Sequence, residues 1–100
     1  MFARIGTFEM SPLSLDTVAA LLRDQAVPAF SKHDGFLGYQ AYVDRARGRL
    51  IGISLWTTCP TLEASAETGR QAVRKAAELG AVVVEDMQIF ELTFDVCLQL

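Results

Sequence analysis

The chain has 100 residues, of which 51% are hydrophobic and 21% are charged. A chain of this length forms one domain, expected here over residues 1–100, and it buries roughly two-thirds of its unfolded surface, so its core needs no metal or disulfide. The hydrophobic fraction excludes a disordered chain. The net charge of −3 and the lack of a basic tract argue against a nucleic-acid partner.

The sequence gives no sign of a membrane segment or of a secreted scaffold. Its apolar runs, such as residues 81–84, are far shorter than the span of about 20 residues that crosses a membrane. Cys59 and Cys97 are too few and too far apart for a disulfide framework or a zinc site. We therefore expect a cytoplasmic protein with no cofactor, no metal and no membrane partner.

The first half of the chain predicts a strand, a helix and a hairpin. Residues 2–10 have the β-branched and aromatic residues of a strand. Apolar residues then recur every three or four positions, which predicts a helix from about Leu15 to Ser31 with a bend at Pro28. Residues 36–44 and 49–57 read as two strands joined by a short loop, in which Gly48 supplies a left-handed backbone.

The second half predicts one more helix and one more strand. Thr58 or Cys59 caps the helix, and Gly80 follows its last turn. Residues 81–97 form a long strand, or two strands with a bend near residues 85–86. The order is β-α-β-β-α-β, which predicts an α+β, ferredoxin-like fold: a four-stranded antiparallel sheet, order 4-1-3-2, with both helices on one face.

Both faces of this predicted sheet carry large apolar side chains. In the third strand, Ile51, Ile53 and Leu55 share one face by period two, whereas Leu50 and Trp56 lie on the other. The last strand likewise places Met87 and Ile89 opposite Phe90, Leu92 and Phe94. Two helices cover only one face, so we expect a second copy of the chain to cover the other face in a homodimer.

The sequence resembles the antibiotic biosynthesis monooxygenase (ABM)-like domains of the dimeric α/β-barrel superfamily. The resemblance rests on MFARIGTFEM in the first strand, VPAFSKHDGFLGYQAYVD from the first helix into the second strand, ISLWTTCPTLEAS from the third strand into the second helix, and VVVEDMQIFEL at the end. It implies a dimeric α/β barrel with a cleft between the sheet and helices of each protomer. Such domains include two kinds of enzyme: cofactor-independent oxygenases, which form quinones, and enzymes that degrade haem.

The resemblance carries over at few individual residues. Trp56 matches the tryptophan that the oxygenases place in the cleft at the end of the third strand. Those enzymes also use an asparagine, and this sequence contains none. The haem degraders take an iron ligand from the second helix, whereas His33, the single histidine, follows the first.

Trp56 shares its strand face with Ser54 and Gly52, two small residues that leave volume beneath the second helix. One interpretation is an apolar ligand cleft with Trp56 as a wall and its indole N–H as a donor. The alternative is close packing of helix on sheet.

Two charged or titratable residues are further candidates for this cleft. Arg4 lies on the central strand, where it either forms an ion pair with Glu91 or Glu85 or presents a cation to a ligand. His33 is either a general base beside Asp34 or a partner of the helix end. Tyr39 and Tyr42 point to opposite faces, so only one of them lines the cleft.

These observations predict a homodimer that binds a small, flat organic molecule in a cleft formed by Trp56, Ser54, Gly52, Arg4 and His33. If the protein is an enzyme, the expected reaction is cofactor-independent oxygenation of an electron-rich aromatic. The alternatives are a ligand-binding or accessory dimer without catalysis, and a haem-binding protein.

Overall fold

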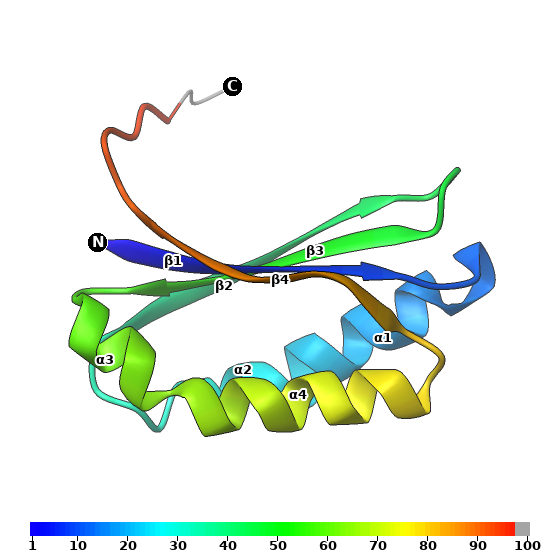
Figure 1. The fold of residues 1–100 in the computed structure, drawn as a ribbon, viewed down its shortest axis with the longest axis horizontal. Coiled ribbons are helices and arrows are strands. Elements are labelled where there is room, and N and C mark those ends of the chain that lie inside the picture. Colours follow the sequence, from blue (N-terminus) through cyan, green and yellow to red (C-terminus); the bar gives the residue numbers. More distant parts are fainter. Residues whose placement is uncertain (98–100) are drawn as a thin grey trace.

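The structure is a computed structural model in which residues 1–97 are described. Four antiparallel strands form one sheet, with the helices on one of its faces (Figure 1). The strands are β1 (Phe2–Glu9), β2 (Phe36–Asp44), β3 (Arg49–Trp56) and β4 (Val82–Glu91). Their order, β2-β3-β1-β4, confirms the predicted ferredoxin-like topology.

The hairpin between β2 and β3 forms where the sequence predicts it. Gly48 has φ +66°, and its carbonyl accepts a hydrogen bond of 2.8 Å from the backbone N–H of Met10. The register pairs Tyr39 with Ser54 and Tyr42 with Ile51. Tyr39 therefore points toward the helices, and Tyr42 points to the outer face, where 55% of it is exposed.

The first long helix is continuous but irregular near Pro28. It consists of α1 (Leu15–Leu21), a π-helical turn (Leu22–Ala26) and α2 (Val27–Phe30). In the π-helical turn the N–H of Val27 bonds to the carbonyl of Leu22, five residues back. Proline donates no hydrogen bond and its ring crowds the preceding turn, so the predicted bend takes the form of this widened turn.

The predicted second helix is divided in two at Ser65. Its parts are α3 (Cys59–Ala64) and α4 (Ala66–Glu78). Thr58 caps α3 and exchanges hydrogen bonds with Thr61 in a capping box. The backbone angles of Ser65 are not helical. Its fully buried hydroxyl donates a hydrogen bond to the carbonyl of Leu62 at 2.7 Å.

The sheet buries one face and exposes the other. Residues that face the helices include Phe8, Leu50 and Trp56, which form the core together with Leu15, Val18, Leu22, Phe30 and Leu62. No helix among residues 1–97 covers the outer face (Figure 1). That face carries Ile5, Ile51, Ile53, Leu55 and Phe90, as the period-two pattern predicts.

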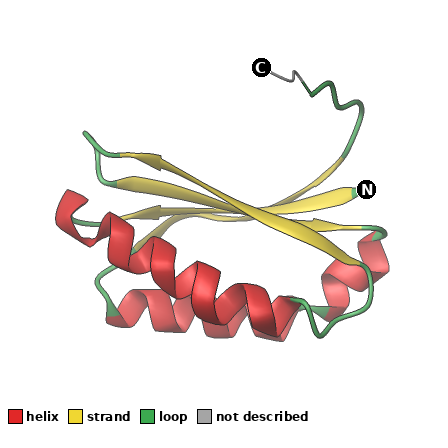
Figure 2. Cartoon of the chain, turned by 180° about the vertical axis from the view of Figure 1, so that it is seen from behind, coloured by secondary structure: helices red, strands yellow, loops and turns green. Residues whose placement is uncertain are grey.

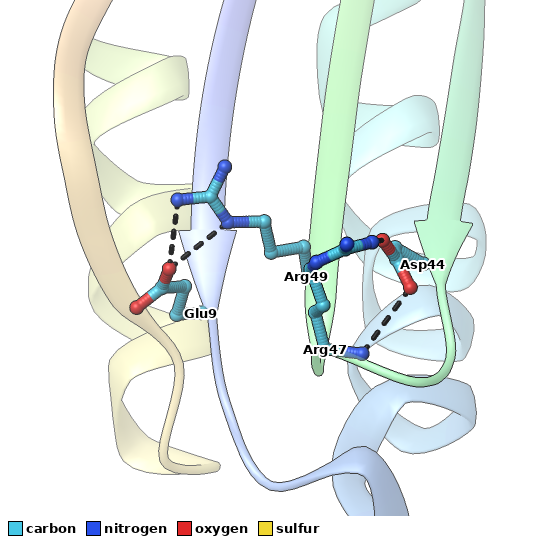
Figure 3. Close-up of polar contacts among 4 residues, drawn as sticks. All are labelled: Glu9, Asp44, Arg47 and Arg49. Atoms are coloured by element: carbon cyan, nitrogen blue, oxygen red, sulfur yellow. Dashed lines mark hydrogen bonds and ion pairs between the residues drawn. The ribbon is translucent and has the colours of Figure 1, made fainter.

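The outer face is apolar in the middle of the sheet and charged at the hairpin end. Glu9 and Arg49 lie opposite each other in register and form an ion pair of 2.8 Å (Figure 3). In the hairpin loop, Arg47 forms an ion pair with Asp44, also at 2.8 Å (Figure 3). Exposed pairs of this kind add little stability.

The last strand is shorter than predicted, and its register against β1 shifts at two places, between Ile5 and Thr7 and between Thr7 and Phe8. Ile5 pairs with Gln88 and Thr7 with Glu85, so that Asp86 and Met87 together stand opposite one residue of β1. This bulge is the predicted bend near residues 85–86. Residues 92–97 leave the sheet on the side away from the helices (Figure 2). In the described part of the chain, no helix has the length and apolar character needed to cross a membrane.

Candidate functional site

A small cavity of about 30 Å³ lies between the inner face of the sheet and the helices. Three glycines line it, one each from β1, β3 and α4, and each leaves room for a larger side chain. The pairs are Met87 over Gly6, Tyr39 over Gly52 and Arg4 against Gly69. A Cβ atom at Gly6 would lie 2.9 Å from the Met87 sulfur, so these glycines are needed for close approach. The remaining space is large enough for a water molecule and too small for an aromatic ligand.

Arg4 extends from the central strand β1 to the junction of α3 and α4. Its Nη2 donates to the carbonyl of Leu62 at 2.6 Å, and its Nη1 donates to the hydroxyl of Ser65 at 3.1 Å. Only 8% of Arg4 is exposed. Burial and the nearby charge of Arg70 lower the pKa of Arg4 from its usual value.

The predicted ion pair of Arg4 with Glu91 or Glu85 is wrong. The register of β4 places Ile89 beside Arg4, whereas Glu91 lies opposite Phe2. Glu85 lies opposite Thr7, on the outer face. Among the ion pairs within residues 1–97, none involves Arg4, whose hydrogen bonds go to Leu62 and Ser65 instead.

Tyr39 brings a second polar group to the cavity. Its ring stacks on Phe30 with 6.0 Å between centroids, and its hydroxyl lies over Gly52. Burial raises the pKa of Tyr39 to about 12, so the phenol keeps its proton near neutral pH. Its hydroxyl makes no hydrogen bond to the described part of the chain, and it is therefore a free donor.

A wider groove of about 420 Å³ opens between α4 and β4. It shares Arg4, Gly69, Val73 and Met87 with the small cavity, so Met87 and Val73 lie between the two spaces. The complete lining is Arg4, Ala66, Gly69, Arg70, Val73, Arg74, Val83, Asp86 and Met87. Its wall is therefore apolar with three cations and a single carboxylate.

The structure brings three of the five predicted site residues together. Gly52, Ser54 and Arg4 line the small cavity, whereas their predicted role in binding a ligand stays a prediction. Trp56 does not line it, and the expectation that Trp56 forms a wall of the cleft needs correction. The ring is fully buried, and its N–H donates to the hydroxyl of Ser54 at 2.9 Å.

Aromatic packing is the physical reason why Trp56 is enclosed. Phe30 and Phe36 meet the indole edge-to-face, with 5.9 and 5.3 Å between ring centroids. His33 approaches the same ring at 6.2 Å. The alternative interpretation of Trp56, close packing of helix on sheet, is thus the one that the structure supports.

His33 also lies outside the cavity. Its Nε2 is 2.7 Å from the hydroxyl of Thr68, so the half-buried ring ties the end of α2 to α4. His33 lines neither the small cavity nor the groove between α4 and β4. In the portion of the chain that the structure describes, no cluster of three or more potential metal ligands occurs.

Sequence reasoning missed Met87, Arg70 and Arg74. A signal for the glycines was present, because Gly6 shares its strand face with Arg4 and Gly69 lies on the inner stripe of its helix. The period-two pattern placed Met87 on the same face as Ile89, but nothing in the sequence marked that face of β4 as part of a groove.

Comparison with solved structures identifies the fold. The chain superposes on SnoaB, a cofactor-independent oxygenase from Streptomyces nogalater, with a TM-score of 0.69, 15% identity and 95% of both chains covered. HapK from Hahella chejuensis gives a TM-score of 0.73 with 12% identity over 99% of this chain and 100% of its own. A structure described as an antibiotic biosynthesis monooxygenase gives a TM-score of 0.64 with 19% identity, covering 96% of this chain and 100% of its own. The chain has the ABM fold.

Relatives in sequence match most of this chain but are longer. The chain is 37% identical over 91 residues to Rv2558, an uncharacterized protein of Mycobacterium tuberculosis, and 34% identical over 91 residues to Rv2557 of the same organism. The match covers 89% of this chain and 39% and 41% of those proteins, so the chain spans about two-fifths of their length. No family model matches the sequence.

Proposed function

We propose that this ABM-like protein binds a small, largely aromatic molecule in the groove between α4 and β4. The observation that carries the proposal is the groove itself. Its volume of about 420 Å³ falls within the range of roughly 300–1,000 Å³ that is usual for ligand pockets. Val73, Val83 and Met87 give it apolar walls, and Arg4 and Asp86 supply polar groups of opposite charge.

The reaction that we propose for this groove is a cofactor-independent oxygenation. An activated methylene group of the aromatic reacts with O₂ and becomes a carbonyl, and the second oxygen atom leaves as water with the two hydrogens. Asp86 is the carboxylate of the groove lining that can take the first proton, and Arg4 is the donor that stabilises the resulting oxyanion. The ABM fold shared with SnoaB supports this class of reaction.

The experiment titrates 1,8-dihydroxyanthrone into the protein under nitrogen by calorimetry, and then measures oxygen uptake and quinone formation in air. Ala66→Phe fills the groove and is expected to weaken binding at least about tenfold, or ~1.4 kcal/mol. Ala77→Phe is the matched control, because Ala77 is exposed on the same helix and lies outside the groove lining.

Each outcome separates the proposed function from an alternative. Binding with oxygen uptake that Ala66→Phe abolishes supports the oxygenase. Binding without oxygen uptake above the uncatalysed rate refutes the reaction and supports a ligand-binding or accessory protein. A Soret shift with haem that Ala66→Phe removes would favour haem binding. No binding of any planar aromatic refutes the proposal.

We also propose that the protein is a homodimer through the outer face of the sheet. That face presents Ile5, Ile51, Ile53, Leu55 and Phe90, and no helix in residues 1–97 covers it. The chain after β4 leaves the sheet on this side (Figure 2), and its Phe94 and Val96 are 78% and 74% exposed. A contiguous apolar surface of this kind is typical of an obligate interface.

The dimer is tested by light scattering and by the protein-concentration dependence of thermal unfolding. We expect a mass of twice 11.0 kDa and an unfolding temperature that rises with concentration. Ile51→Glu should unfold the protein rather than release stable monomers, because such an interface resembles a core cut in half. Leu13→Glu is the control, since Leu13 is exposed in the short 3-10 helix Pro12–Ser14, outside the sheet. A wild-type mass near 11 kDa at micromolar concentration would contradict the proposal.

A further inference from the structure

We infer that the ligand of the groove is an aromatic oxyanion, a carboxylate or an ionised phenol, whose negative charge is neutralised by Arg4. This inference names the ligand class for the proposed binding function and therefore rests on it. The observation behind it is that Arg4 is buried and forms no ion pair within residues 1–97.

Arg4 differs from every other arginine of the chain. The six others are exposed, and each lies within 3.0 Å of a carboxylate oxygen. Arg4 is 92% enclosed, and its two hydrogen bonds go to uncharged oxygens of Leu62 and Ser65. A buried cation without a counterion is unfavourable, whereas one that gains an anion in a shielded site is strongly stabilised.

The guanidinium is accessible from the space where a ligand would lie. Arg4 lines both the groove and the inner cavity. A guanidinium has five N–H donors, and the protein uses two of those of Arg4, so the others are available to a carboxylate or phenolate oxygen. A planar aromatic ring would then rest on Val73, Val83 and Met87.

The rim of the groove has the same sign of charge. Arg70 and Arg74 both lie on the groove, and both donate to the same carboxylate, Glu67, at 2.9 Å. One carboxylate cannot neutralise two guanidinium groups. Asp86 is the single carboxylate in the groove lining, so together with Arg4 the groove has an excess of positive charge. Such a field favours the entry of an anion.

A purely structural role of Arg4 makes a different prediction. Its bond to the carbonyl of Leu62 braces the last turn of α3, and that bond requires no ligand. If this were its whole function, substitution would change stability and would not alter the preference of the groove for charged over neutral ligands. The charge preference therefore distinguishes the two roles.

The test compares 2-naphthoate with 2-naphthamide, which have the same ring and differ in charge. Calorimetry of the wild-type protein is expected to show 2-naphthoate binding about tenfold more tightly at low salt. Arg4→Gln should abolish this preference. Arg45→Gln should retain it, because Arg45 is exposed in the hairpin loop and pairs with Asp16. If Arg4→Gln does not fold, the Nε–H resonance of Arg4 in the wild type should move with 2-naphthoate and not with 2-naphthamide.

The outcomes keep this inference separate from the proposed function. Equal affinity of the wild type for the two probes overturns the anion preference and leaves the groove as an aromatic site. The assignment to Arg4 is overturned if the Arg4→Gln variant still binds 2-naphthoate more tightly than 2-naphthamide. It is also overturned if the Nε–H resonance of Arg4 does not shift when 2-naphthoate is added. Failure of both probes to bind refutes the proposed binding function itself.

Discussion

Truncation of Trp56 to alanine should destabilise the protein by an amount that reports how the ring is enclosed. The side chain is fully buried between Phe30, Phe36 and His33. Removing about 200 Å² of buried aromatic surface at about 25 cal/mol per Å² costs about 5 kcal/mol, and measured core truncations of this kind cost about 3–5 kcal/mol. Because whole domains are stable by only about 5–15 kcal/mol, the variant should lie near its unfolding threshold.

Urea unfolding followed by circular dichroism measures this loss without relying on the tryptophan signal. Trp56→Phe should lose less, about 1–2 kcal/mol, because it keeps a ring and forfeits mainly the hydrogen bond to Ser54. Leu13→Ala serves as a control that should stay within about 0.5 kcal/mol, since Leu13 is 93% exposed.

The fluorescence of Trp56 provides an independent check on the same reasoning. It is the only tryptophan in the chain, so its emission reports this site alone. A fully buried indole should emit at short wavelength and resist quenching by acrylamide. A loss of only about 1–2 kcal/mol in Trp56→Ala, together with efficient quenching in the native protein, would refute the enclosed packing and restore an open cleft at this residue.

Three further predictions concern other residues. Burial raises the pKa of Tyr39 from 10.0 to about 12, so the fold favours the protonated phenol. The stability that this preference contributes is complete below pH 10. About 2–3 kcal/mol of the free energy of unfolding is lost as the pH rises through 12. Urea titrations at several alkaline pH values should show this loss, and Tyr39→Phe should reduce it. Gly48→Ala should cost roughly 2 kcal/mol or more, because φ is +66° and the new Cβ would strike the carbonyl of Met10, whereas Gly38→Ala, with open space around it, should be tolerated far better in the same assay. Haem spectra of the wild type and of His33→Ala should be the same, because this imidazole is engaged with a hydroxyl on α4; a Soret band lost in the variant would contradict that.

The strands and their order could be predicted because their signals are local. Alternation of apolar residues specifies which side chains of β3 share a face, and a glycine with a left-handed backbone specifies the hairpin loop. The small residues Gly52 and Ser54 also predicted the space beneath the second helix, and both line the inner cavity. These features depend on neighbours within a few residues in the chain.

The site itself depends on registers and packing that no short stretch of sequence specifies. Whether Arg4 has a carboxylate partner depends on which residue of β4 lies beside it, and the register of β4 places Ile89 there. Whether Trp56 lines a cleft or belongs to the core depends on how Phe30 and Phe36, which come from other elements, pack against its ring. By itself the sequence determined the topology, because strand periodicity and turn chemistry are short-range; tertiary packing decided which polar groups stay unpaired, because a partner can come from anywhere in the chain.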